Sequence, residues 1–289
     1  MNRGRVYVMH GIGHRPRAGS FLDRNLLDRA WFLDDLDRRP NRFVKLDEAL
    51  AGKGDALTID DGIYACFDAA MAARERGHEV TLFVNPGNIE NQTPYWFSLL
   101  NLGLDRTTRS EISWNGCRYL LRGTEAKQSF RNLVKVEICR IDQETAVMDY
   151  LDAVLTELGV ANRELPHALR PLTRDDLKSL AMAGVQIENH GWSHSRASDM
   201  GAARMAADIR LGRAWLAETL GIESRMFAAP FGDSPPPADL PADLCDLWFM
   251  ADYRLQPGLI SPGVFNRKYL DANPSIVSRI KATIERRFR

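Results

Sequence analysis

The chain has 289 residues, of which 45% are hydrophobic and 26% charged, and this balance excludes a disordered chain. Lysine and arginine together number 38, and so do aspartate and glutamate, so no net charge attracts nucleic acid over long range. Because α/β barrels often reach about 250 residues as one unit, we expect a single domain over residues 1–289.

The sequence offers no stretch suited to membrane insertion or secretion. No apolar run is long enough to span a bilayer, and the N-terminal residues lack the apolar core of a secretory signal. The cysteines form no C-x-x-C pair, which is typical of ordinary thiols in a reducing compartment. We therefore expect a cytoplasmic protein with no nucleic-acid partner and no transmembrane segment, and no pattern indicates an oligomeric state.

Strands and helices are predicted to alternate from the start of the chain. Residues 5–10 are rich in β-forming side chains and predict a first strand that ends at His10. A helix is predicted from an N-cap at Ser20 to about Arg38, because leucines recur at helical spacing between them. The elements predicted next are a strand over 56–59, a helix over 63–76 and a strand over 80–84.

The same alternation returns after about residue 170. The elements predicted there are a helix from Thr173 to Gly184, a strand over 185–188, a helix over 200–220 and a strand over 226–229. Repetition of this kind indicates parallel strands joined by right-handed crossovers. Near the C-terminus, Ile276, Ile280 and Ile284 fall at helical spacing and predict a final helix.

Residues of about 88–170 interrupt the alternation and are interpreted as an α+β insertion. Residues 111–121 predict a hairpin that turns at Asn115–Gly116, and residues 143–158 predict a helix. Because active-site variation in barrel folds lies in the loops after strands, we expect this segment to act as a lid or to contact substrate.

Two short motifs carry the strongest chemical signal. Thr58-Ile59-Asp60-Asp61-Gly62 ends a predicted strand, and His190-Gly191-Trp192-Ser193-His194 follows another. Adjacent residues of a strand point in opposite directions, so one aspartate is able to bind a metal while the other faces elsewhere. One carboxylate and two imidazoles leave a coordination position open for water, as in a catalytic metal site.

These motifs resemble those of the polysaccharide deacetylases, the NodB-like group also called carbohydrate esterase family 4. That family has T-F-D-D-G and H-[ST]-x-x-H motifs on a distorted (β/α) barrel. A third match is Phe227-Ala228-Ala229-Pro230-Phe231-Gly232, which resembles the F-A-x-P-[YF]-G version of a further motif. Three matches in the family order make the resemblance specific, and it implies an α/β fold with a distorted (β/α)7-type barrel.

The resemblance also implies a role for each matched residue. Asp61, His190 and His194 are expected to bind a divalent metal, and Asp60 is expected to be the general base that deprotonates the attacking water. The backbone N–H of Phe231, in the turn that follows Pro230, is expected to stabilise the oxyanion. Zinc is the expected ion, although these ligands also suit cobalt, nickel, iron or manganese.

The sequence departs from the family pattern at two positions. Ala228 stands where the family commonly has an arginine that orients the base, and Arg225 is one candidate to replace it. No histidine follows His194, so the usual late general acid is absent. Because His10 ends the first strand and related proteins often carry a histidine at a similar place, we expect His10 to be the general acid.

The function expected from these features is metal-dependent removal of an N-acyl group, an acetyl group above all, from an amino sugar. The expected substrate is a small-molecule or lipid-linked sugar or a sugar-containing metabolite, with Trp192 and Trp248 as candidate groove residues. Three alternatives stay open at this point. They are an inactive metal-binding or glycan-binding module, an amidase or deformylase that acts on a non-acetyl amide, and an iron(II) oxygenase with the same ligand types.

Overall fold

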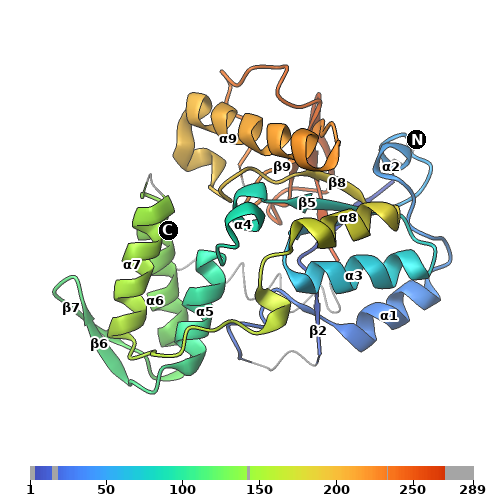
Figure 1. The fold of residues 1–289 in the computed structure, drawn as a ribbon. Helices are drawn as coiled ribbons and strands as arrows, with labels where there is room; N and C mark the ends of the chain where they lie inside the picture. The colour runs from blue at the N-terminus through green and yellow to red at the C-terminus, as the bar shows by residue number, and fades with distance from the viewer. Residues whose placement is uncertain (1–3, 15–18, 142–143, 233, 271–289) are drawn as a thin grey trace.

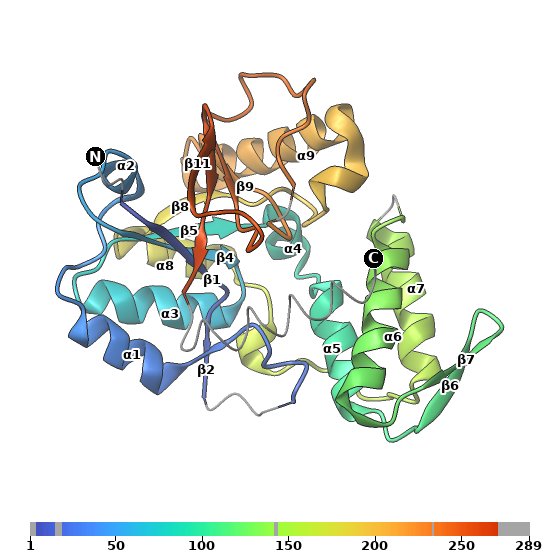
Figure 2. The same cartoon turned by 180° about the vertical axis from the view of Figure 1, so that it is seen from behind.

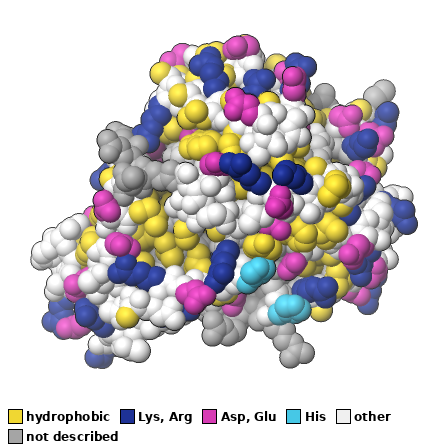
Figure 3. Space-filling view, viewed as in Figure 1, with side chains coloured by type: hydrophobic (Ala, Val, Ile, Leu, Met, Phe, Trp, Pro, Cys, Tyr) yellow, Lys and Arg dark blue, Asp and Glu magenta, His cyan; other side chains and the backbone are white. Residues whose placement is uncertain are grey.

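The structure is a computed structural model, and it describes residues 4–14, 19–141, 144–232 and 234–270 (Figure 1). The predicted final helix with Ile276, Ile280 and Ile284 lies outside the described residues. No described helix has the length and hydropathy needed to cross a bilayer. On the face shown in Figure 3, basic and acidic side chains are interspersed, in keeping with the net charge of zero.

A large sheet forms the centre of the described part of the chain. Its parallel strands follow the order β10, β9, β8, β5, β4 and β1. Their bounds are β1 (Val6–Met9), β4 (Ala56–Asp61), β5 (Val80–Val84), β8 (Gln186–Asn189), β9 (Met226–Ala228) and β10 (Leu247–Met250). All residues of β4 and β5 are buried, as expected of parallel strands that are covered on both faces.

The sheet closes on itself through one late segment. Strand β12 (Val264–Asn266) pairs in parallel with β10, and strand β13 (Lys268–Tyr269) pairs in parallel with β1. Only Arg267 separates β12 from β13, so this segment joins the two sides of the sheet. The segment of β12 and β13 thus takes the place of a seventh strand beside the six parallel strands, and the sheet forms a distorted parallel barrel. Strand β11 (Gly258–Ser261) pairs antiparallel with β12 at the edge.

Helices pack beside the barrel, and all of them except α2 overlap a helix that the alternation predicts. They are α1 (Arg29–Arg38), α2 (Leu46–Leu50), α3 (Tyr64–Glu75), α8 (Arg174–Met182) and α9 (Ala197–Leu220). Helix α3 contacts α1 and α8, and α9 lies along β8 (Figure 1). Thr173 caps α8 by accepting a hydrogen bond from the backbone N–H of Asp176, which confirms the predicted start of that helix.

The predicted helix from Ser20 is wrong over its first nine residues. Helix α1 begins only at Arg29, and the Asp28 carboxylate caps it by accepting from the Trp31 N–H. Asp105 provides the physical reason, because its carboxylate accepts hydrogen bonds from the Ser20 hydroxyl (2.7 Å) and the Phe21 N–H (2.9 Å). This distant partner holds the segment in a turn, and two residues pair as strand β3 (Leu27–Asp28) with β2 (Ile12–Gly13).

Residues 88–170, named here the 88–170 segment, fold to one side of the barrel (Figures 1 and 2). The segment begins within α4 (Pro86–Asn91). It then contains α5 (Trp96–Arg106), β6 (Glu111–Trp114), β7 (Cys117–Leu120), α6 (Gly123–Ile138), α7 (Glu144–Glu157) and the 3-10 helix η1 (His167–Leu169). The predicted hairpin and the predicted helix over 143–158 are confirmed as β6–β7 and α7. Asn115 and Gly116 both have positive φ, as a tight hairpin turn requires.

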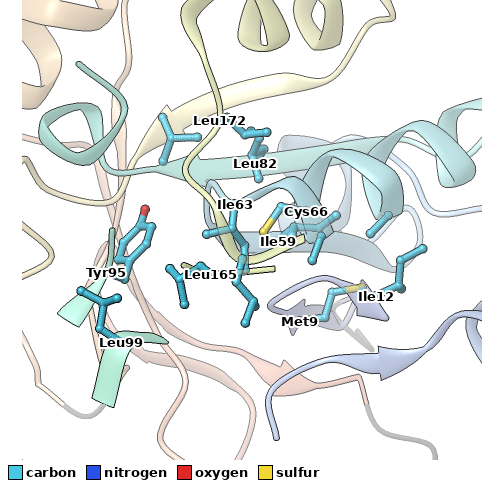
Figure 4. Packing of buried hydrophobic residues seen from close by; sticks show 14 of the residues in the cluster. Met9, Ile12, Ile59, Ile63, Cys66, Leu82, Tyr95, Leu99, Leu165 and Leu172 are labelled. Carbon is cyan, nitrogen blue, oxygen red and sulfur yellow. The ribbon is translucent and has the colours of Figure 1, made fainter. Parts of the chain in front are cut away.

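Apolar packing joins this segment to the barrel. Tyr95 and Leu99 of its first part, with Leu165 near its end, are buried in the same cluster as Ile63 and Leu172 (Figure 4). Within the segment, helix α5 contacts both α6 and α7. The helices of the segment therefore pack on one another, and its two ends pack against the barrel through buried apolar side chains.

Candidate active site

The three expected metal ligands lie together at the carboxyl end of the barrel strands. Asp61 ends β4, and His190 and His194 belong to the loop after β8. The Asp61 Oδ1 atom lies 3.6 Å from His190 Nε2 and 3.2 Å from His194 Nε2, and all three side chains are buried. One ligand atom from each residue lies within 4.8 Å of the others. This donor set fits a divalent ion with an open coordination position.

The protonation states also suit metal binding. Burial raises the pKa of Asp61, but hydrogen bonds to His190 and His194 outweigh it and hold the pKa well below its usual range. Burial lowers the pKa of His194, so its imidazole is favoured in the neutral form. His190 Nδ1 lies 2.7 Å from the carbonyl oxygen of Ala228, and in the neutral tautomer that donates to this oxygen the Nε2 lone pair would be left for a metal ion.

The backbone is strained at three of these site positions. Asp61 (φ 88°), His194 (φ 50°) and Phe231 (φ 66°) have left-handed backbone conformations that side chains other than glycine rarely adopt. Such conformations persist only where the surrounding structure fixes them, and they cluster at functional sites.

The second carboxylate, Asp60, forms a buried ion pair with Arg267. The two guanidinium Nη atoms of Arg267 each lie 2.7 Å from one Asp60 oxygen, and Nη1 also donates to the Thr58 hydroxyl (3.1 Å). The exposed fractions of the Arg267 and Asp60 side chains are 0% and 4%. Burial raises the pKa of Asp60, but the Arg267 charge and hydrogen bonds and the His190 charge lower it below its usual value.

Arg267 corrects the suggestion that Arg225 orients the base. Arg225 instead forms an exposed ion pair with Asp246 (2.7 Å), away from Asp60. The sequence pattern did not reveal Arg267 because it lies 207 positions after Asp60, between two very short strands. Ala228 replaces the arginine that is common in the family, and the guanidinium beside Asp60 comes instead from Arg267, in the segment that closes the barrel.

His10 lies at the same end of the barrel. It follows β1, and its ring stacks on Tyr269 with the ring centroids 6.2 Å apart. Charge on His10 contributes to the lowered pKa of both Asp60 and Asp61. His10 therefore shares the carboxyl end of the sheet with the carboxylate pair.

The Pro230-Phe231-Gly232 turn lies beside the histidines. The Phe231 ring is 5.1 Å from the His194 ring and 6.3 Å from the Trp96 ring, and the Lys135 Nζ atom is 4.7 Å from its centroid. Gly232 has positive φ, and a side chain there would meet Ala251 at 2.8 Å. Only glycine lets the turn approach the barrel this closely.

The two tryptophans named from the sequence are not equivalent. Trp248 is 2% exposed, packs on Phe227 at 4.6 Å and donates its indole N–H to the Ser234 carbonyl. Trp248 is therefore a core residue, because a buried indole needs a fixed partner, and the interpretation as a groove residue was wrong. Trp192 is partly buried, and its backbone carbonyl accepts from the Gly87 N–H (3.1 Å).

Residues outside the motifs hold the histidine loop in place. The Asn85 amide donates to the carbonyls of His190 (2.6 Å) and Gly191 (3.0 Å), and the Tyr95 hydroxyl donates to the carbonyl of Asp61. The buried Asp208 carboxylate of α9 accepts from the Trp192 N–H, the Ser193 N–H and the Ser193 hydroxyl. Burial raises the pKa of Asp208, although these donors act in the opposite direction.

Sequence reasoning missed Asn85, Tyr95 and Asp208, although Asp208 gave a usable signal. It is an aspartate in the middle of an otherwise apolar turn of a predicted helix, where a buried carboxylate needs donors from elsewhere.

A pocket of about 250 Å³ opens at this site. His194 and Phe231 line one part of it, and residues of α5, α6, α7 and the start of α9 line the rest. The described residues thus combine a three-ligand centre, a paired second carboxylate and an adjoining pocket, which is the arrangement of a barrel hydrolase.

Comparison with known families agrees with this class. The family model for polysaccharide deacetylase matches residues 48–242, which is more than half of the chain. The chain therefore belongs to the polysaccharide deacetylase family, and the expected resemblance is confirmed. No curated protein matches the sequence.

Solved structures agree in fold. The deacetylase PplD of Streptococcus pyogenes, solved in complex with acetate, has a TM-score of 0.57 at 12% identity, and the match covers 97% of each chain. IcaB from Ammonifex degensii has a TM-score of 0.53 at 18% identity, again over 97% of each chain. The polysaccharide deacetylase BC0361 from Bacillus cereus has a TM-score of 0.54 at 9% identity and covers 97% of this chain and 69% of its own. The expected α/β fold of the distorted (β/α)7-barrel type is confirmed.

Proposed function

We propose that the protein is a metal-dependent hydrolase that removes an N-acyl group, an acetyl group above all, from an amino sugar. Family membership supports a hydrolytic carbohydrate deacetylase. The observation that carries the metal-dependent part is the convergence of Asp61, His190 and His194, with the Asp60 carboxylate beside them. Zinc is the proposed ion, because carboxylate and imidazole ligands with an open position are typical of catalytic zinc.

The chain's own residues supply the steps of amide hydrolysis. Asp61, His190 and His194 would hold the ion, which would lower the pKa of bound water and polarise the amide carbonyl. Asp60 accepts a proton from the attacking water, since each carboxylate oxygen keeps a lone pair beyond the one that Arg267 uses. The Phe231 N–H donates to the oxyanion that forms on the carbonyl.

Cleavage of the C–N bond requires a proton on the leaving nitrogen. We assign this proton to His10, whose charge acts on both carboxylates. The product pair is then a free amine and a carboxylate.

Replacement of His10 tests this assignment. A His10→Gln variant should lose about 10²-fold or more in kcat while it keeps its metal, because general acid catalysis contributes roughly that factor. The pH–rate profile should also lose the limb that reports the acid. Full activity across the pH range would contradict the role.

We further propose that residues 1–289 act as one catalytic unit in which the 88–170 segment covers the substrate. Its contribution to the pocket beside His194 supports this role. A small-molecule or lipid-linked sugar suits the pocket of about 250 Å³ better than an enclosed polymer chain does.

The inactive-module alternative rested on two missing residues. Arg267 supplies a guanidinium to Asp60, and His10 lies at the site, so the motivation for that alternative is weaker. The amidase alternative differs only in the acyl group and is tested together with the main proposal.

The decisive experiment joins metal analysis to an acylate-release assay. Purified protein should contain about one divalent ion per chain, and it should release acetate from N-acetylated sugars without oxygen. An Asp60→Asn variant should keep the ion but lose about 10²-fold to 10⁴-fold in kcat. Release of formate alone would favour a deformylase, and oxygen-dependent turnover would contradict hydrolysis.

A further inference from the structure

The pocket beside the metal centre has two parts of different chemistry. Near His194, the Phe231 ring stacks on Trp96 at an interplanar angle of 29°, so this part is aromatic. Farther along the chain, the end of α6, the turn after it and α7 contribute uncharged, mainly aliphatic side chains to the same pocket. These are Ile138, Cys139, Ile141, Val147 and Met148.

The residues that the structure describes leave the aliphatic part of the pocket partly open. Ile141, Val147 and Met148 are half-buried, whereas Ile138 beside them is 3% exposed. Apolar surface that is left accessible inside a concave site is a place where a ligand gains free energy by covering it. The loop before α9 adds Ser195 and Arg196 to the pocket, and the start of α9 adds Asp199 and Arg204.

This division indicates how an amino sugar with an attached chain would lie. Aromatic rings such as Trp96 and Phe231 pack on the apolar face of a sugar ring, while hydroxyl groups face the polar start of α9. A sugar ring alone gives the aliphatic wall of α6 and α7 nothing apolar to bind. An alkyl chain attached close to the scissile amide matches that wall.

Resting on the proposed amide hydrolysis, we propose that the substrate is an amphiphilic amino sugar that carries an alkyl chain longer than a methyl group near the amide. The chain is either the N-acyl group itself or an alkyl aglycone on the same sugar. Both present the same methylene surface to Ile141, Val147 and Met148.

Two substrate series separate the two sources. The first holds a methyl glycoside of glucosamine constant and lengthens the N-acyl group from acetyl to octanoyl. The second holds the N-acetyl group constant and lengthens the alkyl glycoside over the same range. Each methylene that the wall buries should raise kcat/KM about fourfold, the equivalent of about 0.8 kcal/mol.

Variants in the wall test whether this surface causes the preference. Val147→Thr keeps the side-chain shape but replaces one methyl group with a hydroxyl, and Met148→Lys places a charge at the wall. Both should reduce kcat/KM for the longest good substrate about tenfold more than for the acetyl methyl glycoside. Met182→Lys is the matched control, because Met182 is 82% exposed on α8 and does not line the pocket, and it should leave the chain-length profile unchanged.

The outcomes are distinguishable. A gain along the first series assigns the chain to the acyl group, and a gain along the second assigns it to the aglycone; either supports the proposal. Hydrolysis of acetyl substrates with a flat response in both series would overturn this proposal and leave the proposed function intact. No hydrolysis of any amide by the metal-loaded enzyme would overturn both.

Discussion

The metal end of the barrel and the 88–170 segment are stabilised in different ways. At the barrel end, buried charged and polar groups are held by specific partners, as in the Asp60–Arg267 pair and the Asp208 contacts to the histidine loop. In the described part of the 88–170 segment, the buried side chains are apolar or uncharged, and ion pairs such as Arg109–Glu157 are exposed. Charged and polar partners therefore fix the geometry of the metal end, while apolar packing holds the segment that shapes the pocket.

If charged contacts and apolar packing act separately in this way, changes that spare the residues joining the two regions should act mainly on one of them. Substitutions at the barrel end should alter metal binding and catalysis, and substitutions in the 88–170 segment should alter local stability and substrate choice. Four changes test this division, in order of decreasing effect.

Removal of Arg267 should have the largest effect. An Arg267→Met variant leaves the Asp60 carboxylate buried without its counter-ion, and removal of one partner of a buried ion pair costs about 3–5 kcal/mol of unfolding free energy. Denaturant unfolding measures this loss, and kcat should fall as well because Asp60 is no longer oriented.

A double variant serves as the control for Arg267. Asp60→Asn combined with Arg267→Met removes both charges, so its loss of stability should be smaller than the sum of the single losses. Additive losses would show that the pair does not act as a unit.

Truncation of Leu155 should destabilise the 88–170 segment without disturbing the metal site. Leu155 is fully buried, and it lies so close to Gly103 that a side chain on that glycine would meet it at 2.5 Å. A Leu155→Ala variant should lose about 2–5 kcal/mol of stability through the cavity that it creates. Hydrogen exchange should locate the loss in α5 and α7, and a fall in metal content would contradict the division.

Replacement of Asp208 should weaken metal binding more than folding. Asp208→Asn keeps the size of the side chain but replaces one carboxylate oxygen, which accepts from the loop N–H groups, with an amide NH2 group, which donates. The histidine loop should therefore be held less firmly. Metal affinity, measured by competition with a chelator, should fall about 10-fold to 100-fold. Glu218→Gln neutralises an exposed carboxylate of the same helix and should change nothing.

The smallest effect is expected at Arg225. Its ion pair with Asp246 is exposed, with side-chain exposed fractions of 68% and 55%, so an Arg225→Ala variant should lose less than about 1 kcal/mol. Its kcat should match that of the unaltered protein. A large fall in kcat would return Arg225 to the candidates for orienting the base.

The sequence was most informative where local chemistry determines the structure. The strand before Asp60, the glycine after α3 and the Asn115–Gly116 turn each carry their own signal within a few residues, and the structure has the corresponding elements. The expected metal ligands also come from two compact motifs, and the fold brings them to one place.

Prediction failed where a distant residue decides the outcome. Ser20 has the pattern of a helix cap, but Asp105 binds its hydroxyl and delays the helix. Arg267 has no motif around it, and its role depends on closure of the barrel between β10 and β1. Neither contact leaves a periodic or local trace in the sequence.

The position of Arg267 has a consequence for synthesis of the protein. The ribosome releases the chain from its N-terminus, and Arg267 emerges 207 residues after Asp60. A nascent chain that stops before Arg267 already contains both aspartates and both histidines of the centre, yet its base lacks the guanidinium. The Asp60–Arg267 pair therefore forms only after the chain has been translated through Arg267 and β13 has met β1.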